Sequence, residues 1–283
     1  IVARLMSIYI EGFRNIPVLL WIVMIFALFT EFTPAPKAFK GADPQASMML
    51  FDSVAITNRG TYLPIPVMGP GAYWLLMCLS LSIMVAIYFI RYARKVKKDT
   101  GRGVPVFWIS IGIITIPCII TFFMLGKPIS FEYPYLKGFN FKDGIHLRNS
   151  FLALTLALAF YTSAFIAEIV RSGILAISKG QTEAASALGL RPNKIMNLIV
   201  LPQALRVIVP PMISQYLNLT KNSSLAIAVG YMDVRGTLGG ITLNQTGREL
   251  ESMLLLMGFY LTVSLLISSI INYFNRSFQI VGR

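Results

Sequence analysis

Amide, hydroxyl and ammonium side chains interrupt an apolar stretch of the chain, in the run Asn218-Leu-Thr-Lys-Asn-Ser-Ser224. Ionisable side chains at membrane depth cost about 2.5–3.5 kcal/mol each on insertion scales, so they tend to face protein or water. The run follows Pro210 and Pro211, and broken helices at that depth are tolerated where they line a cavity, where they can bind charged ligands. We therefore predict a helix break at the prolines, followed by a polar site that can bind a small charged ligand.

The side chains predicted to line this site are Lys221, Asn222, Ser223, Ser224 and Asn218. Small polar residues also pack helices against each other in membranes, and the sequence leaves that alternative open.

An earlier apolar stretch supplies further candidates for the same path. Glu168 is an ionisable residue within that stretch, and it lies three residues before Arg171. This spacing places two side chains on one helix face, so a purely structural ion pair is as consistent with the sequence as a substrate contact. Tyr161 and Thr162 are weaker candidates on the same stretch.

The sequence contains no signature of catalysis or of a metal site. Cys78 and Cys118 both fall inside apolar runs, and His146 lies in a loop without neighbouring Cys or His. No G-x-x-x-x-G-K-[ST] phosphate loop is present, so the chain does not bind ATP by that route. We predict no catalytic residue, no metal and no cofactor in this chain.

Composition indicates a membrane protein. The 283 residues are 55% hydrophobic and only 13% charged, whereas soluble domains are typically about 25% charged. The formal net charge of +13 is also typical of nucleic-acid-binding proteins. Most of the Lys and Arg residues lie between long apolar runs, however, as they do in cytoplasmic loops of membrane proteins. We therefore predict a lipid bilayer, and no nucleic acid, as the partner of this charge pattern.

Six stretches meet or approach the roughly 20 apolar residues that a bilayer-spanning helix needs. They are Ile16–Phe32, Ala72–Arg91, Val104–Leu125, Ser150–Val170, Leu205–Tyr231 and Met253–Ile271. The predicted fold class is an all-α integral membrane protein with about six transmembrane helices.

Lys and Arg residues set the predicted orientation of these helices. They concentrate in Arg91–Arg102 and Arg171–Arg206, two segments that two spans separate and that therefore share one side, the cytoplasm. The segments predicted on that side also include Ile1–Asn15 and the C-terminal tail Asn272–Arg283, while Phe32–Gly71, Gly126–Asn149 and Met232–Ser252 lie outside. The first outer loop is rich in proline and glycine, which predicts irregular surface structure.

The segment between the fourth and fifth spans reads Gln181-Thr-Glu-Ala-Ala-Ser-Ala-Leu-Gly189-Leu-Arg-Pro192-Asn-Lys-Ile-Met-Asn-Leu-Ile199-Val-Leu201-Pro202. It predicts two short helices with a turn, because Gly189 can close a helix in the left-handed conformation and Pro192 suits the first turn of the next helix. Pro202 marks an end or a kink. A DNA-reading helix-turn-helix has a similar pattern, but membrane spans flank this one and would hold it at the bilayer surface.

The spacing Glu183-Ala184-Ala185, three residues, Gly189, nine residues, Ile199, one residue, Leu201-Pro202 resembles the EAA loop of ABC importer permeases. This resemblance implies that the hairpin forms coupling helices that dock on a cytoplasmic ATPase. The residues that the resemblance assigns to coupling are Glu183, Ala184, Ala185, Gly189, Leu201 and Pro202. A merely structural cytoplasmic hairpin remains the alternative.

Other segments resemble the polar-amino-acid branch of these permeases. They are Phe13-Arg-Asn-Ile-Pro17, Ala167-Glu-Ile-Val-Arg-Ser-Gly-Ile174, Pro202-Gln-Ala-Leu-Arg206, Lys221-Asn-Ser-Ser-Leu225 and Leu243-Asn-Gln-Thr-Gly247. A long insertion over residues 33–148, with two extra spans, resembles the general L-amino-acid or glutamate/glutamine/aspartate/asparagine permeases. The organisation predicted is one permease domain over residues 1–283, with a core at 150–275 that contains the coupling loop 178–206. The family should carry at least one further span before Ile1, so we expect an N-terminal truncation.

The resemblance implies a type I ABC importer permease in the bacterial inner membrane. Its implied partners are a dimer of ABC ATPase subunits that bind ATP and Mg²⁺, a second permease subunit, identical or related, and a periplasmic amino-acid-binding protein. Permeases for other solutes, ion-driven secondary transporters and non-transporting scaffolds are the alternatives. The polar run in the fifth span argues against a scaffold.

Overall fold

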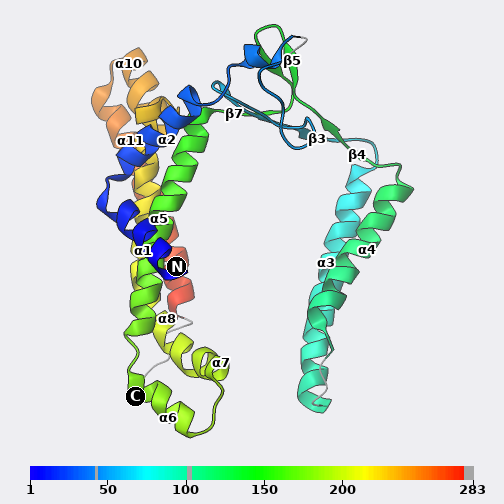
Figure 1. Ribbon diagram of the computed structural model, residues 1–283, viewed down its shortest axis with the longest axis vertical. Helices are drawn as coiled ribbons and strands as arrows, with labels where there is room; N and C mark the ends of the chain where they lie inside the picture. Colours follow the sequence, from blue (N-terminus) through cyan, green and yellow to red (C-terminus); the bar gives the residue numbers. More distant parts are fainter. Residues whose placement is uncertain (42–43, 101–103, 277–283) are drawn as a thin grey trace. The chain divides into compact units, whose positions relative to one another are not determined.

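The computed structural model describes residues 1–41, 44–100 and 104–276. The α-helices are α1 (Val2–Asn15), α2 (Val18–Glu31), α3 (Ala72–Thr100), α4 (Val106–Met124), α5 (Asn149–Leu175), α6 (Lys179–Ala187), α7 (Pro192–Ile195), α8 (Leu201–Asn222), α9 (Val234–Gly236), α10 (Leu243–Thr246) and α11 (Glu249–Arg276) (Figure 1). Short 3₁₀ helices are η1 (Pro36–Phe39) and η3 (Ser223–Val229), and π-helical turns are η2 (Met196–Val200) and η4 (Thr237–Thr242).

The described residues form two compact units. The bundle unit comprises Ile1–Ala35, Thr57–Gly60 and Leu147–Arg283, and the insert unit comprises Pro36–Ile56 and Thr61–His146. Arg102, the last residue of the predicted cytoplasmic segment Arg91–Arg102, lies outside the described residues, as does the part of the predicted cytoplasmic tail beyond residue 276.

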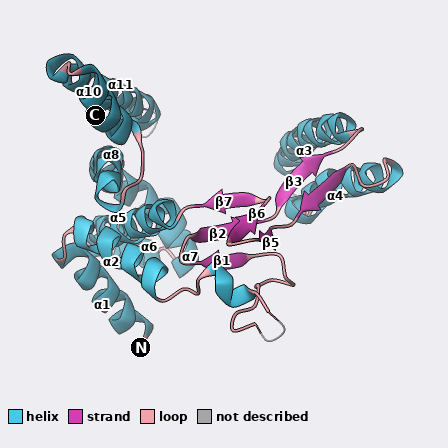
Figure 2. Ribbon diagram, turned by 90° about the horizontal axis from the view of Figure 1, so that it is seen from above, coloured by secondary structure: helices cyan, strands magenta, loops and turns pink. Residues whose placement is uncertain are grey.

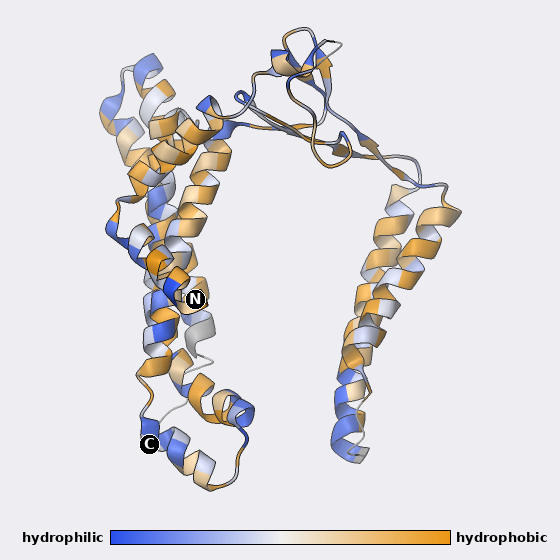
Figure 3. Cartoon of the chain, in the orientation of Figure 1, coloured by the Kyte–Doolittle hydropathy of each residue, from blue (hydrophilic) through white to orange (hydrophobic). Residues whose placement is uncertain are grey.

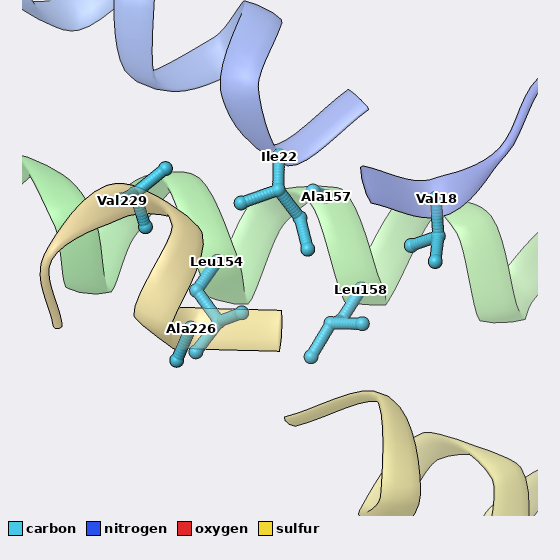
Figure 4. Close-up of a cluster of buried hydrophobic side chains, with 7 residues drawn as sticks. All are labelled: Val18, Ile22, Leu154, Ala157, Leu158, Ala226 and Val229. Atoms are coloured by element: carbon cyan, nitrogen blue, oxygen red, sulfur yellow. The ribbon is translucent and has the colours of Figure 1, made fainter. Parts of the chain in front are cut away.

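Helix α5 forms the centre of the bundle unit, where α1, α2, α8 and η3 pack against it. Its small residues allow this close packing, since Ala153, Ala157 and Ala164 are completely buried. Figure 4 shows the principal cluster, in which side chains of α2 and η3 meet those of α5. The buried members are Val18, Ile22, Leu154, Ala157, Leu158, Ala226 and Val229. Small residues at helix contacts are typical of membrane bundles, because they let helix backbones approach closely.

Within the described residues, five helical stretches are long and apolar enough to cross a membrane, or six if a bent pair is counted as one span. The five are Ala72–Asp99, Val106–Met124, Asn149–Leu175, Pro192–Val229 and Glu249–Tyr273. The prediction of about six spans is therefore confirmed for the last five, and the first needs a correction. Helix α2 has only 14 residues, or about 21 Å at 1.5 Å per residue, which is short of the roughly 30 Å hydrocarbon core.

The bend in this first span lies between α1 and α2, which meet at an angle of 107°. Pro17 causes the bend, because the residue before a proline is disfavoured in the helical region, and Ile16 is accordingly extended at φ −106° and ψ 132°. The Tyr9 hydroxyl of α1 donates a hydrogen bond to the Phe160 carbonyl of α5 at 2.6 Å. Helix α1 therefore lies against the bundle, where the sequence predicted only a cytoplasmic lead-in segment.

The predicted helix break at Pro210 and Pro211 is wrong, because α8 continues through both prolines to Asn222. Membrane helices tolerate internal prolines where neighbouring helices support the chain, and here α8 packs along α5. The backbone instead changes at residue 223, where η3 begins, and the α8–η3 segment ends at Gly230 in the left-handed conformation with φ 67°. The polar run therefore occupies the last turns of α8 and the first turn of η3.

The segment predicted as an irregular outer loop, like the second predicted outer segment, contains short strands. The strands in the described part of the chain are β1 (Ala55–Thr57), β2 (Gly60–Leu63), β3 (Ile65–Met68), β4 (Ile129–Glu132), β5 (Tyr135–Lys137), β6 (Asn140–Lys142) and β7 (Ile145–Leu147) (Figure 2). They form one three-stranded sheet, in the order β1-β2-β7, and two antiparallel pairs, β3-β4 and β5-β6. A small apolar cluster of Ala55, Tyr62 and Phe141 supports them, so the all-α prediction holds for the membrane helices only.

Strand β3 leads directly into α3, and strand β4 follows directly after α4. Their register pairs Ile65 with Glu132 and Met68 with Ile129. The two helices pack along each other, and the Thr121 hydroxyl lies 3.3 Å from the Cys78 sulfur across this contact. Apolar residues cover most of both helices, with hydrophilic residues at the end of α3 (Figure 3).

Candidate functional site

The segment with the strongest sequence motif folds as the predicted helical hairpin. Helices α6 and α7 meet at Gly189, which adopts the left-handed conformation with φ 76°. The Gly189 amide donates to the Ser186 carbonyl at 2.9 Å and the Leu190 amide donates to the Ala185 carbonyl at 3.2 Å. This pair of bonds is the Schellman arrangement, which satisfies the last carbonyls of a helix. The predictions for Gly189 and for Pro192, the first residue of α7, are confirmed.

A small core fixes the angle between the two arms of the hairpin. Ala185 of α6, Ile195 of α7 and Val200 of η2 are 2%, 3% and 6% exposed and pack together. Ala185 therefore faces the inside of the hairpin and supports it. The resemblance assigns Ala185, together with Ala184, to coupling with the ATPase.

The outer surface of the hairpin combines one acidic residue with apolar ones. Glu183 and Ala184 are exposed on α6, and Leu188 at the corner is 82% exposed. Leu201 and Pro202 begin α8 directly after the η2 π-helical turn, and both are exposed. The hairpin thus presents one carboxylate and several apolar side chains that its own small core does not cover.

A polar recess of about 210 Å³ lies between α5 and α8 in the bundle unit. Four of the predicted path residues line it, namely Tyr161, Thr162, Asn218 and Asn222. The lining also includes three residues that the sequence reasoning missed, Phe165, Gln215 and Leu219. Residues 215, 218, 219 and 222 are spaced i, i+3, i+4 and i+7, which is one helix face, so this periodicity could have identified Gln215.

The remaining residues of the predicted polar site do not line this recess. Lys221 is exposed on another face of α8, since adjacent residues of a helix point about 100° apart. The Ser223 and Ser224 hydroxyls each donate at 2.7 Å to a backbone carbonyl three residues earlier, that of Thr220 and that of Lys221. These serines thus hydrogen-bond to the backbone at the junction between α8 and η3.

Glu168 takes part in an ion pair and does not line the recess. Its carboxylate accepts hydrogen bonds from Arg171 Nε at 2.9 Å and Arg171 Nη2 at 2.5 Å. Arg14 of α1 lies 4.0 Å from the same carboxylate, with its guanidinium carbon 5.7 Å from the centre of the Phe165 ring. Of the two alternatives for Glu168, the geometry favours the structural one, a pair with Arg171 within α5. The additional contact with Arg14 links this pair to α1.

Three residues that sequence reasoning did not select form a polar cluster that contacts the start of η3, namely Asp233, Arg235 and Tyr260. The Arg235 guanidinium donates to the Ser224 carbonyl at 3.1 Å. Asp233 caps α9 by accepting from the Gly236 amide at 2.9 Å, and the Tyr260 hydroxyl of α11 lies 3.5 Å from the same carboxylate. No local motif marks this cluster, because Asp233 and Arg235 come from α9 and its N-cap whereas Tyr260 comes from α11.

The fold and these two surfaces define a class of protein. Several membrane-spanning helices, a polar recess between two of them and a rigid hairpin with an exposed face are the features of a membrane transport permease. A family model described as "Binding-protein-dependent transport system inner membrane component" matches residues 99–280. The chain belongs to this family of permeases.

Individual relatives show which permeases of this family the chain is similar to. The chain is 51% identical over 306 residues to the glutamate/glutamine/aspartate/asparagine transport system permease protein BztB of Rhodobacter capsulatus, a match that covers 100% of this chain and 71% of the relative. It is 41% identical to the general L-amino acid transport system permease protein AapQ of Rhizobium johnstonii, over 100% of this chain and 68% of the relative. It is also 41% identical to the putative amino-acid ABC transporter permease protein YhdX of Escherichia coli, over 99% and 69%. The resemblance predicted from the sequence motifs is therefore confirmed.

Proposed function

We propose that this chain is a membrane-spanning subunit of an ATP-driven importer of polar L-amino acids, with the type I ABC importer permease fold. The names of three relatives that match nearly the whole chain, including the insertion at residues 33–148, support an amino-acid substrate. The whole of residues 1–283 acts as one permease domain, in which residues 150–275 form the transporting core.

The proposal includes an orientation and a set of partners. The chain lies in the bacterial inner membrane with the coupling loop 178–206 and the C-terminus in the cytoplasm, where most loop Lys and Arg residues would then lie. Its partners are a dimer of ABC ATPase subunits, which bind ATP and Mg²⁺, a second permease subunit and a periplasmic amino-acid-binding protein. ATP binding closes the ATPase dimer, the hairpin moves with it, and the pore turns from one side of the membrane to the other.

The observation that carries this proposal is the rigid hairpin with an exposed, partly apolar face. Three buried residues of the hairpin and the Schellman turn at Gly189 hold α6 and α7 at a fixed angle. A rigid element transmits displacement, whereas a flexible loop would absorb it. Glu183 and Leu188 are the two exposed residues best placed to contact the ATPase, one by charge and one by insertion into an apolar groove.

Coupling through the hairpin is tested with the reconstituted transporter and its operon-encoded ATPase. In the parent complex, ATP hydrolysis should rise when the cognate binding protein and its amino acid are added. Glu183→Lys should abolish that rise and Leu188→Ala should reduce it several-fold, while Glu132→Lys, the same charge change on strand β4, should leave it unchanged. If ATP hydrolysis is stimulated equally in the Glu183→Lys and Glu132→Lys complexes, the hairpin does not couple the permease to the ATPase.

We propose that the recess between α5 and α8 is part of the substrate path. Its lining offers amide and hydroxyl groups from Asn218, Asn222, Gln215 and Thr162, which can hydrogen-bond the carboxylate and ammonium groups of an amino acid. Its volume of about 210 Å³ lies below the 300–1,000 Å³ that is typical of sites for drug-sized ligands, which fits a small substrate.

Two matched pairs of variants test this path. Thr162→Val removes a hydroxyl from the recess with little change of shape, whereas Thr155→Val makes the same change at an exposed position of α5. Asn222→Leu alters the recess, whereas Lys221→Leu alters the next residue outside it. Transport of the amino acid should fall at least tenfold in Asn222→Leu and by about three- to tenfold in Thr162→Val, the loss of one hydrogen bond, with both controls near the parent rate. Equal effects within each pair would place the path elsewhere.

A further inference from the structure

A second, larger recess lies in the insert unit, between the basic end of α3 and the start of α4. Its volume is about 510 Å³. The residues of α3 that line it are Ile90, Ala93, Arg94 and Lys97, and those on the α4 side are Val104, Val106, Phe107, Ser110, Ile111 and Ile114. One end of this recess is therefore cationic, and its walls are aliphatic and aromatic.

The position of this recess along the two helices corresponds to a membrane–water interface. Helix α4 has 19 residues, about 28 Å, and so is close to the hydrocarbon thickness. Exposed aromatic residues begin each helix, Tyr73 and Trp74 on α3 and Phe107 and Trp108 on α4. Aromatic residues are enriched at both interfaces of a bilayer, and because α3 and α4 are consecutive antiparallel spans these two pairs mark opposite interfaces. Arg94 and Lys97 thus lie at headgroup level, and Ile111 and Ile114 lie deeper.

A buried hydroxyl on the wall of the recess lacks a partner. Ser110 is 9% exposed, and its Oγ atom has no hydrogen-bond partner within residues 1–41, 44–100 and 104–276. A buried hydroxyl without a hydrogen bond costs about 1–3 kcal/mol in proteins, so such groups normally have a protein, water or ligand partner. Because Ser110 lines the recess, an oxygen atom of a ligand in the recess is in a position to accept a hydrogen bond from its hydroxyl.

We propose that this recess binds the headgroup of an anionic phospholipid. The Arg94 guanidinium and the Lys97 ammonium hold the phosphate by charge-assisted hydrogen bonds, and the Ser110 hydroxyl donates to a further headgroup oxygen. An acyl chain extends from there along Ile90, Ile111 and Ile114. The lipid then fills the recess between α3 and α4.

Charge complementarity selects an anion as the occupant. The end of α3 carries Arg91, Arg94, Lys95, Lys97 and Lys98, against the single acidic residue Asp99. Each Lys or Arg near a membrane surface contributes about 1 kcal/mol of attraction to anionic lipid, about fivefold in affinity. The recess adds specificity to this general attraction, because only two of these five cations line it.

The proposal is tested by counting the lipids that remain bound to the assembled transporter. The full complex is reconstituted in nanodiscs of equimolar phosphatidylcholine and phosphatidylglycerol, released into detergent and measured by native mass spectrometry. The parent should retain phosphatidylglycerol in preference to phosphatidylcholine. Arg94→Gln with Lys97→Gln should lower this retention about tenfold or more. Lys95→Gln with Lys98→Gln removes the same charge from the same helix end outside the recess, and it should change retention less than about threefold, because the general attraction to a membrane surface is absent after release into detergent.

Ser110→Ala provides an independent variant that does not alter charge. Since the hydroxyl has no partner in the described residues to lose, a purely structural role predicts unchanged lipid retention. Loss of a hydrogen bond to the headgroup predicts about a three- to tenfold fall in phosphatidylglycerol retention.

Three results would overturn the proposal. Equal losses in the two double variants would show a general field of the helix end. Equal retention of phosphatidylcholine and phosphatidylglycerol would show a lipid-filled groove without headgroup selection. Displacement of the lipid by glycerol phosphate, the headgroup without acyl chains, would identify a site for a free anion.

Discussion

Helix α5 and the pair α3–α4 are all apolar enough to cross a membrane, yet their surroundings differ. Of the most apolar window of α5, 39% is buried within the chain, against 11% for α3 and 6% for α4. Helix α5 contacts α1, α2, α8 and η3, while α3 and α4 contact chiefly each other. Hydropathy alone does not distinguish them, because lipid and protein interiors are equally apolar.

This difference separates two tasks within the membrane. The bundle around α5 places small residues at helix contacts and holds polar groups between helices, which is what a transport path and a coupling hairpin require. The α3–α4 pair turns its large apolar side chains outward and carries its charges at one end. Variants that change the same residue type in both regions test whether this division is real.

The largest effect is expected at the contact between α5 and α8. A Cβ atom at Gly173 would collide with the Ile208 side chain, which is 3% exposed and has little room to move. Gly173→Ala should therefore destabilise the folded protein by about 1–3 kcal/mol, as overpacking typically does. Thermal unfolding of the purified chain in detergent measures this change.

Gly112→Ala on α4 is the matched control. A Cβ atom there meets only Ile116 Cδ1 of the same helix, at 3.7 Å. Alanine is preferred to glycine within helices by about 1 kcal/mol, so this variant should be as stable as the parent or more so. Equal losses at both glycines would contradict the contrast between the two regions.

A second effect, about 1–2 kcal/mol, is expected at the hairpin. Gly189 has open space around the position of a Cβ atom, so Gly189→Ala is penalised only by the left-handed backbone. The variant should lose protection of the α6 amides in hydrogen exchange and part of the ATPase stimulation. Gly180→Ala, within α6, should have the opposite effect on α6 protection, and a similar loss in both would refute the role of the turn.

A smaller effect is expected where α1 meets α5. Arg14 and Glu168 are 41% and 23% exposed, and partly exposed ion pairs contribute roughly 0–1 kcal/mol. Arg14→Gln should raise hydrogen exchange in α1 slightly, without a measurable change in thermal unfolding. Arg4→Gln removes the same charge from an exposed position of α1 and should change neither, so a change in exchange for Arg4→Gln would argue against the pair.

The smallest effect on the bundle is expected when the α3–α4 pair is removed. Strands β3 and β4 pair Met68 with Ile129, so an Asn-Gly turn can replace Gly69–Pro128, as such turns join antiparallel strands. The unfolding temperature of the bundle should change by no more than the unfolding temperature changes in the Gly112→Ala variant. The selective retention of phosphatidylglycerol should disappear. Unfolding of the bundle in this variant would show that the insert unit supports it.

Sequence reasoning performed best where the signal is local. The Schellman turn at Gly189 and the start of α7 at Pro192 follow from residues within one helical turn, and both were predicted. The five long spans follow from hydropathy over about 20 residues. The ion pair of Glu168 with Arg171 was one of two predicted alternatives, because i, i+3 spacing brings two side chains together on any helix.

The predictions that failed concern contacts between segments. Pro210 and Pro211 indicated a break, yet α8 continues because its packing against α5 compensates for the lost backbone hydrogen bonds. The short strands of the insert unit depend on pairing between residues as distant as Ile65 and Glu132, which no local pattern reveals.

The sequence by itself determined that this chain crosses a membrane several times and presents a helical hairpin with the motif of its permease family, since apolar length and turn chemistry act over one or two helical turns. Only the tertiary structure decided which polar residues share a recess. It groups Thr162 with Gln215 and Asn222 and turns Lys221 away from them, because the rotation of α8 about its axis is set by packing against α5. The physical reason is that a helix exposes every side chain equally until a neighbour covers one of its faces.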